Sequence, residues 1–128
     1  IYIASKNGMV ASPGTSAYGA MKAAEIHLAR VLAAEGAPLG IRVNTVNPDA
    51  VLRGSKIMSE GFRLSRAQSL GIKPEELDDH YRKRSLLQRS VYPEDIAEAV
   101  YWFASDASAK STVSILNVDA GHLASFTR

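Results

Sequence analysis

The chain has 128 residues, 46% of them hydrophobic, which is enough for one domain with an ordinary core. Its 15 Lys and Arg against 13 Asp and Glu leave a formal charge of +2 without a basic block, so no nucleic-acid partner is indicated. No apolar run approaches the roughly 20 residues that span a bilayer, so no membrane partner is predicted either. The absence of cysteine excludes disulfides and fits a cytoplasmic location.

The first residues predict a buried strand. Residues 1–4 are all apolar rather than alternating, which is typical of a central strand covered on both faces, and Ser5 ends the run with a hydroxyl group. The chain opens directly in this strand without an initiator Met. It also contains no Gly-rich turn of the kind that holds a dinucleotide pyrophosphate. We therefore expect a piece of a longer polypeptide.

A long helix is predicted next, after a loop that contains Gly and Pro. It begins at Thr15 or Ser16, either of which can cap it, and runs to about Glu35, before Gly36 and Pro38. Apolar residues recur on more than one side of this helix, so we expect it to pack on both the sheet and a partner.

Tyr18 and Lys22 lie four residues apart near the start of this helix, so both side chains leave one face and their tips can meet. An ammonium group held near a phenol stabilises the phenolate, which would make the pair a proton donor and acceptor. We expect the Ser5 hydroxyl to face the start of the helix. The alternatives are a surface Tyr, an exposed helix Lys and a capping Ser.

A second strand is predicted over residues 41–46, which are rich in β-branched side chains and are followed by Asn47 and Pro48. Ligands of open parallel sheets bind beyond the carboxyl ends of the strands. Ser5 and residues 48–51 both lie at that edge, so the topology predicts a ligand site there. The alternative for residues 48–51 is an ordinary strand-ending turn.

The rest of the chain predicts a long segment between strands, here called the excursion, followed by a helix and a third strand. Residues 52–90 lack a strand pattern, and short helices are expected at about 60–70 and 74–84. Pro93 opens a further helix with an apolar face, and residues 113–118 form the third strand.

Two groups of basic side chains could bind an anion: Arg53 with Lys56, and the run Arg82-Lys83-Arg84, whose favoured interpretation is a solvated helix of mixed charge. Arg53 and Lys56 could recognise a carboxylate or phosphate on a substrate, although exposed loop charges are an equal alternative. His27, His80 and His122 are each isolated from other ligand types at metal spacing, so no metal site is predicted.

A Ser that ends an apolar strand, a Gly and Pro turn, and the Tyr18 and Lys22 pair in an Ala-rich helix resemble the short-chain dehydrogenase/reductase family. The segments Asn44-Thr45-Val46-Asn47-Pro48 and Asn117-Val118-Asp119-Ala120-Gly121 extend the resemblance over nearly the whole chain. It implies the carboxyl-terminal part of a Rossmann-type, doubly wound parallel α/β sheet. This part would hold three strands with intervening helices, while the amino-terminal half is absent.

The resemblance also implies an organisation. Residues 1–128 would be one part of a dehydrogenase domain, with a substrate-covering loop at about 52–90. The helix at about 16–35 would form the contact of a homo-oligomer. Residues 119–121 stand for a family turn with a structural role.

The resemblance implies a role for each site residue. Tyr18 would be the general acid/base, Lys22 would bond the ribose of the cofactor, and Ser5 would donate to the substrate carbonyl. Lys22 would also favour the phenolate form of Tyr18, so Tyr18 and Lys22 would both belong to the catalytic and to the cofactor-binding residues. Three residues after the second strand would wall the nicotinamide: Pro48, Asp49 and Val51. At position 49 the family usually has Gly, and at position 53 a Thr stands where this chain has Arg.

The implied function is an oxidoreductase that transfers hydride between a nicotinamide cofactor and a small hydroxy compound or aldehyde. The cofactor would be NAD, with NADP not excluded. Residues 5–8 and 48–57 most resemble the dehydrogenase half of bifunctional rhamnulose-1-phosphate aldolase/lactaldehyde dehydrogenases, which makes lactaldehyde from rhamnose breakdown the narrower substrate. The alternative is a non-catalytic remnant or oligomerisation module. In either case we expect the isolated 128 residues to be inactive.

Overall fold

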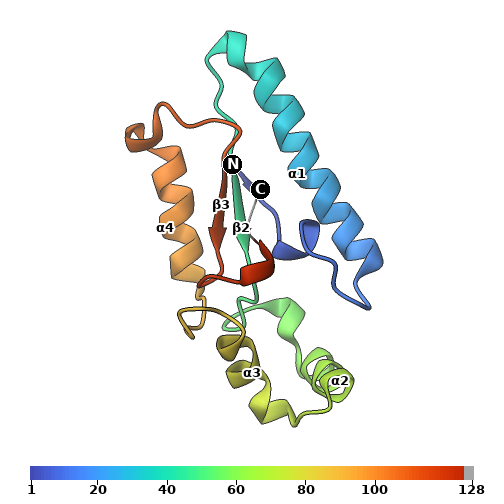
Figure 1. Cartoon of the computed structure of the whole chain (residues 1–128). Helices are drawn as coiled ribbons and strands as arrows, with labels where there is room; N and C mark the ends of the chain where they lie inside the picture. The colour runs from blue at the N-terminus through green and yellow to red at the C-terminus, as the bar shows by residue number, and fades with distance from the viewer. Residues whose placement is uncertain (126–128) are drawn as a thin grey trace.

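A parallel sheet of three strands forms the centre of the protein, whose residues 1–125 are described by a computed structural model (Figure 1). The strands are β1 (Tyr2–Ile3), β2 (Thr45–Pro48) and β3 (Ile115–Val118), in the order β1-β2-β3. Both pairs are parallel, and Val46 of the middle strand lies opposite Ile3 on one side and Leu116 on the other. The predicted fold class, a partial Rossmann-like α/β sheet with intervening helices, is confirmed.

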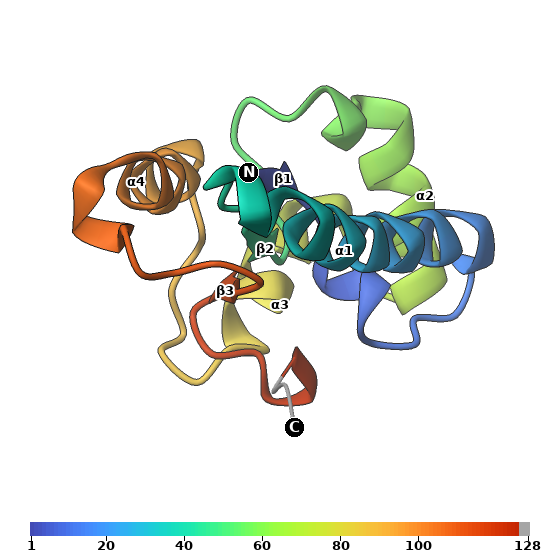
Figure 2. The same cartoon turned by 90° about the horizontal axis from the view of Figure 1, so that it is seen from above.

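Two helices cover opposite faces of this sheet, as the view from above shows (Figure 2). Helix α1 (Ser16–Gly36) packs Ala29 and Ala33 against Val43, while α4 (Pro93–Ala104) packs Phe103 against Val46. Each helix thus packs a separate buried cluster against the sheet. The prediction of a helix that begins after Thr15 and of another that begins at Pro93 is confirmed. Thr15 occupies the capping position but makes no side-chain capping bond, because its hydroxyl donates to the carbonyl of Ser12 at 2.7 Å.

The first strand departs from its prediction. Because β1 pairs with β2 alone, it forms an edge of the sheet rather than its centre. Ile1 is 48% exposed and Ile3 is 40% exposed, whereas Ala4 is buried. Within the described residues, the strand is therefore not covered on both faces, and its outer edge is open to a further strand.

The second strand also begins later than predicted. The backbone N–H of Val43 donates to the hydroxyl of Thr112 at 3.1 Å, and the carbonyl of Val43 accepts from Val113 at 2.8 Å. A side chain thus takes the place of a ladder partner at this position. Regular pairing starts only at Thr45.

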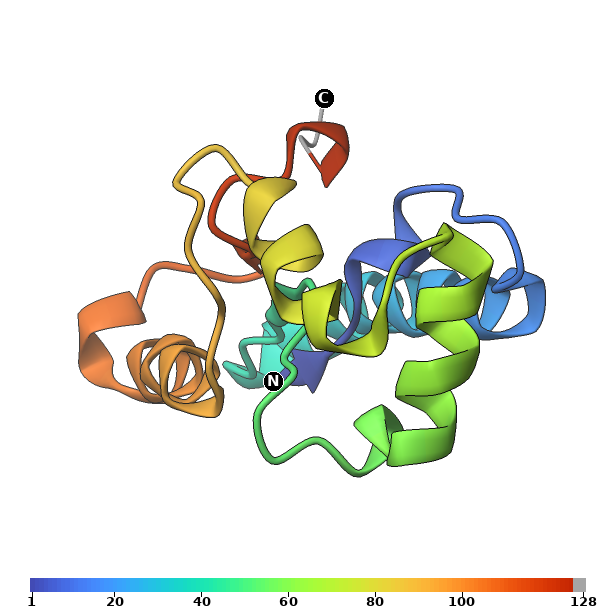
Figure 3. The same cartoon turned by 90° about the horizontal axis from the view of Figure 1, so that it is seen from below.

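The excursion folds as two short helices below the carboxyl ends of the strands (Figures 1 and 3). They are α2 (Glu60–Leu70) and α3 (Leu77–Lys83), which confirms the helices expected at these places. The backbone N–H groups of Leu86 and Leu87 donate to the carbonyls of Gly121 and Ala120, at 3.0 and 3.1 Å. The turn after β3 therefore anchors the end of the excursion.

Within residues 1–125, no helix combines the length and the apolar character that a bilayer crossing requires.

Candidate active site

A cleft of about 840 Å³ opens at the carboxyl ends of the strands, between the start of α1 and the helices of the excursion. This volume lies within the range of about 300–1,000 Å³ that is common for small-molecule sites. Five of the predicted site residues line it: Ser5, Tyr18, Pro48, Asp49 and Val51. The cleft therefore lies at the sheet edge where the topology predicts a ligand site.

Ser5 follows β1 and caps a short 3₁₀ turn, Lys6–Gly8. Its backbone is extended, and its hydroxyl oxygen accepts a hydrogen bond from the backbone N–H of Asn7 at 3.3 Å. This bond is long, and the hydroxyl proton does not take part in it. Ser5 thus combines a weak capping bond with a place on the cleft wall, where its proton remains available.

Tyr18 and Lys22 leave the first turns of α1 but do not share a hydrogen bond. Tyr18 is 42% exposed, lines the cleft and makes no side-chain hydrogen bond within residues 1–125. Lys22 Nζ donates to the carbonyl of Ile3 at 2.8 Å and to Oε2 of Glu25 at 2.7 Å. A carboxylate is a stronger acceptor than a neutral phenol, which explains why the ammonium turns toward Glu25.

The close approach of the 3₁₀ turn to α1 sets the position of Ser5. A Cβ at Gly8 would lie 2.8 Å from the backbone carbonyl carbon of Lys22 and 2.9 Å from Cδ1 of Ile26. One turn earlier, a Cβ at Gly19 would lie 3.0 Å from the carbonyl oxygen of Asn7. Glycine at both positions lets the strand end and the helix touch, so Ser5 and Tyr18 reach the same cleft.

Replacing Gly8 by Ala should therefore lower the free energy of unfolding by about 1–3 kcal/mol, because backbone atoms of α1 cannot give way to the methyl group. Chemical denaturation measures the loss. Gly61→Ala is the matched control, since no atom lies within 4 Å of its Cβ position, and this helical substitution should leave stability unchanged or slightly raised. Equal stability of Gly8→Ala and the control would contradict the close packing.

The turn after β2 is tied down on both sides of the cleft. Val51 forms an isolated parallel bridge with Val91, which leads into α4. Asp49 points to two cations: Arg84 Nη2 lies 2.6 Å from its Oδ2, and Lys6 Nζ lies 3.7 Å from its Oδ1. The carboxylate at the position where the family usually has Gly is thus held in an ion-pair cluster.

Burial and charge shift two groups of this cluster. The pKa of Lys6, which is only 6% exposed, is lowered chiefly by burial and further by Arg84 and Arg66, although Asp49 opposes the shift. The pKa of His122 is lowered by burial, then by Lys6, so the neutral imidazole is favoured. Burial is thus the chief cause of both shifts, and the neighbouring cations add to it.

The basic residues named from the sequence lie elsewhere. Arg53 pairs with Glu94 and lies 4.5 Å over the ring of Tyr92, and Lys56 is exposed. Neither of them lines the cleft. Sequence reasoning instead missed three cations that do: Lys6, Arg66 and Arg84. Two of them carried a signal: Lys6 directly follows Ser5, and Arg84 ends the basic run Arg82-Lys83-Arg84, for which anion binding was the alternative to a solvated helix.

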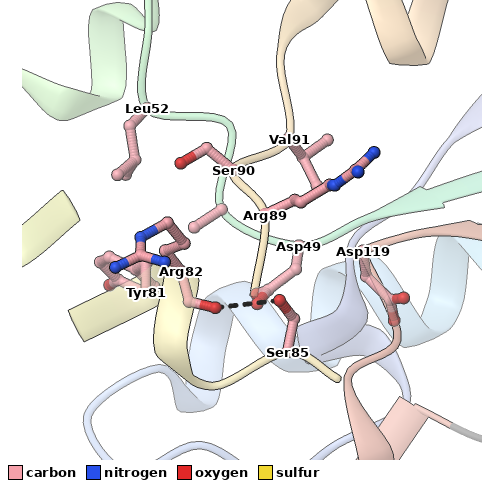
Figure 4. A pocket seen from close by; sticks show the side chains of 10 residues that line it. Asp49, Leu52, Tyr81, Arg82, Ser85, Arg89, Ser90, Val91 and Asp119 are labelled. Carbon is pink, nitrogen blue, oxygen red and sulfur yellow. Dashed lines mark hydrogen bonds between the residues drawn. The ribbon is translucent and has the colours of Figure 1, made fainter. Parts of the chain in front are cut away.

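A smaller hollow lies beside the cleft, between the turn after β2 and α3 (Figure 4). Asp49, Tyr81 and Ser85 lie around it, and the Ser85 hydroxyl donates to the carbonyl of Arg82 at 3.0 Å. Its volume of about 20 Å³ is enough for a water molecule but not for a substrate. The larger cleft is therefore the candidate site.

In the described part of the chain, no group of three or more His, Asp or Glu side chains is placed to hold a metal ion. His27 is exposed, and His80 and His122 are partly buried in separate surroundings.

The fold and the cleft define the class: an α/β protein with a cleft at the carboxyl edge of a parallel sheet, lined by a Tyr and a Ser. Comparison with known proteins agrees. Residues 1–122 match the family model described as enoyl-(acyl carrier protein) reductase. The chain belongs to the short-chain dehydrogenase/reductase family.

Similar proteins include an uncharacterized oxidoreductase, YuxG, of Bacillus subtilis strain 168, which is 51% identical over all 128 residues. Among solved structures, sorbitol-6-phosphate 2-dehydrogenase SrlD from Erwinia amylovora is 31% identical over 94% of this chain, with a TM-score of 0.86. A short chain dehydrogenase from Mycobacterium paratuberculosis, bound to NAD, is 36% identical over 94% of this chain, with a TM-score of 0.78.

The chain spans 19% of the Bacillus relative and 46% and 43% of the two solved chains. Members of the family bind NAD or NADPH.

Proposed function

We propose that this chain is the carboxyl-terminal part of an NAD(P)-dependent dehydrogenase domain that acts on a small hydroxy compound or aldehyde. The observation that carries the proposal is the shared cleft, since Ser5 and Tyr18 both line it beside Pro48. NAD is the expected cofactor, and NADP stays open because the residue that reads the ribose 2′ position follows an earlier strand of such sheets.

Each site residue then has a task. The bound nicotinamide takes or supplies the hydride. Tyr18 takes the proton from the substrate hydroxyl during oxidation, or gives it to the carbonyl oxygen during reduction. Ser5 donates its free hydroxyl proton to the same oxygen and holds it in place. Lys22 Nζ donates two N–H groups to Ile3 and Glu25, and its third N–H group would donate to a ribose hydroxyl.

The nicotinamide would lie against the turn after β2, where Pro48 and Val51 form the wall and Asp49 is held back by its ion pairs. Because that turn is bridged to Val91, it would present a fixed surface to the ring. No residue of this chain offers the Gly-rich cradle for the pyrophosphate.

The rest of the domain would then lie beside β1. The exposed side chains of Ile1 and Ile3, and the position of β1 at the edge of the described sheet, support this placement. Residues 52–90 would act as the substrate-covering element of the domain, since α2 and the end of α3 form one wall of the cleft. Exposed apolar side chains on α1, among them Met21 at 71% and Leu28 at 48%, support the oligomer contact proposed for this helix.

Lactaldehyde from rhamnose breakdown is the narrower substrate candidate, and it rests on the resemblance of residues 5–8 and 48–57 alone. The cytoplasmic location likewise stays a prediction from composition. The alternative function, a non-catalytic remnant or an oligomerisation module, would keep the exposed face of α1 but would not need the cleft.

Absorbance of NADH or NADPH, measured with a panel of small polyols, polyol phosphates and lactaldehyde, separates these functions. The complete polypeptide should reduce NAD with at least one compound, whereas the 128 residues alone should bind NAD poorly and show no turnover. Turnover by the 128 residues alone would contradict the part-domain assignment. Inactivity of the complete polypeptide with the whole panel would favour the non-catalytic alternative.

A further inference from the structure

The cleft carries a surplus of positive charge at the end where substrate would lie. Within the described residues, the charged side chains that line it are Lys6, Arg66, Arg84 and Asp49. Three cations thus face one carboxylate. Positive charge that is partly withdrawn from water and not neutralised is costly, so an anion entering the cleft would be stabilised.

The existing ion pairs leave donors unused. Lys6 pairs with Asp49 alone in the described chain, and the 3.7 Å between Nζ and Oδ1 is too long for a hydrogen bond. Nη2 of Arg84 forms an ion pair with Asp49, but Nε of Arg84 is buried without a partner among residues 1–125. Both cations line the cleft and therefore keep hydrogen-bonding capacity there that the described residues do not use.

Arg66 supplies the third set of donors. Its Nε donates to the Tyr81 hydroxyl at 3.2 Å, and its guanidinium forms no ion pair within the described residues. The ring of Tyr81 also lies 4.4 Å from the guanidinium of Arg84. One aromatic side chain thus holds both arginines in place, which reduces the ordering cost when they bind a ligand.

We propose that Lys6, Arg66 and Arg84 form a subsite for the phosphate-ester group of the substrate. A phosphate monoester carries a charge of about −1.5 to −2 at pH 7, which matches a surplus of two cations better than the single charge of a carboxylate. Its oxygens also fit the paired N–H groups of arginine.

The subsite belongs to the substrate rather than to the dinucleotide. Lys6 is bonded directly to Ser5, the residue assigned to the reacting oxygen, whereas a dinucleotide pyrophosphate lies over a Gly-rich turn that these residues lack. This inference rests on the proposed function and narrows it. Within the proposed class, a phosphorylated compound is favoured over a neutral one such as lactaldehyde.

Binding of inorganic phosphate to the complete protein, measured by titration calorimetry with acetate in a parallel titration, tests the subsite without requiring turnover. Phosphate should bind more tightly than acetate. Arg66→Gln should weaken phosphate binding by about tenfold to a hundredfold, because one charge-assisted donor set is lost. Arg63→Gln is the matched control on the same helix, since Arg63 pairs with Asp78 and does not line the cleft. It should leave phosphate binding unchanged.

Equal binding of phosphate and acetate, or equal losses in Arg66→Gln and Arg63→Gln, would overturn the subsite. Kinetics then separate this result from failure of the proposed function. Hydride transfer from neutral alcohols without any preference for phosphate esters would support the dehydrogenase function and contradict the phosphate subsite. Phosphate binding that depends on Arg66, in a protein that transfers hydride to or from no compound, would support the phosphate-binding site and contradict the dehydrogenase function.

Discussion

Replacing Tyr18 by Phe is expected to lower kcat for hydride transfer by about 10²–10⁴-fold, the usual contribution of a positioned general acid or base. The substitution removes only the hydroxyl group from a side chain that already lines the cleft. Steady-state kinetics of the complete protein at saturating substrate and cofactor measure the effect.

The fold should survive this change. Tyr18 is 42% exposed and makes no side-chain hydrogen bond in the described chain, so its hydroxyl contributes little to stability. Tyr101→Phe is the matched control, because Tyr101 is 73% exposed on α4 and does not line the cleft. Its kcat should equal that of the unchanged protein. If Tyr18→Phe kept ordinary activity with an unchanged melting temperature, the role assigned to Tyr18 would be wrong.

Replacing Phe103 by Ala is expected to lower the free energy of unfolding by about 3–5 kcal/mol. Phe103 is 2% exposed and packs in the buried cluster with Val46 and Ala99, between α4 and the middle strand. Its ring centre lies 5.0 Å from that of Trp102. Truncation would leave a cavity where the helix meets the sheet, and chemical denaturation measures the loss.

The matched control is a truncation of equal chemistry at the surface of the same helix. Tyr101→Ala removes an aromatic ring that is 73% exposed, so the loss should stay below about 1 kcal/mol. A loss of that small size in Phe103→Ala would show that α4 is not held to the sheet by this contact.

The helices were predictable because their signals are local. Thr15 and Ser16 before an Ala-rich run mark the start of α1, Pro93 marks the start of α4, and Pro74 precedes α3. Caps and apolar spacing act within one or two turns, so the sequence carries them without knowledge of the fold. Strand limits depend instead on a partner. Thus β2 begins at Thr45 because Thr112, far along the chain, occupies the earlier position.

The features of the candidate site likewise separate into those that local sequence determines and those that depend on tertiary contacts. The sequence by itself determined that Ser5 and Tyr18 flank a strand end and a helix start, since chain connectivity and helical spacing place them there. Only the tertiary structure decided that Lys22 bonds the carbonyl of Ile3, and that Asp49 is shared by Lys6 and Arg84. Packing likewise decided that Lys6, Arg66 and Arg84 line one cleft, because the excursion that carries both arginines folds back over the strand ends. Electrostatic interactions depend on distance in space and not on separation along the chain.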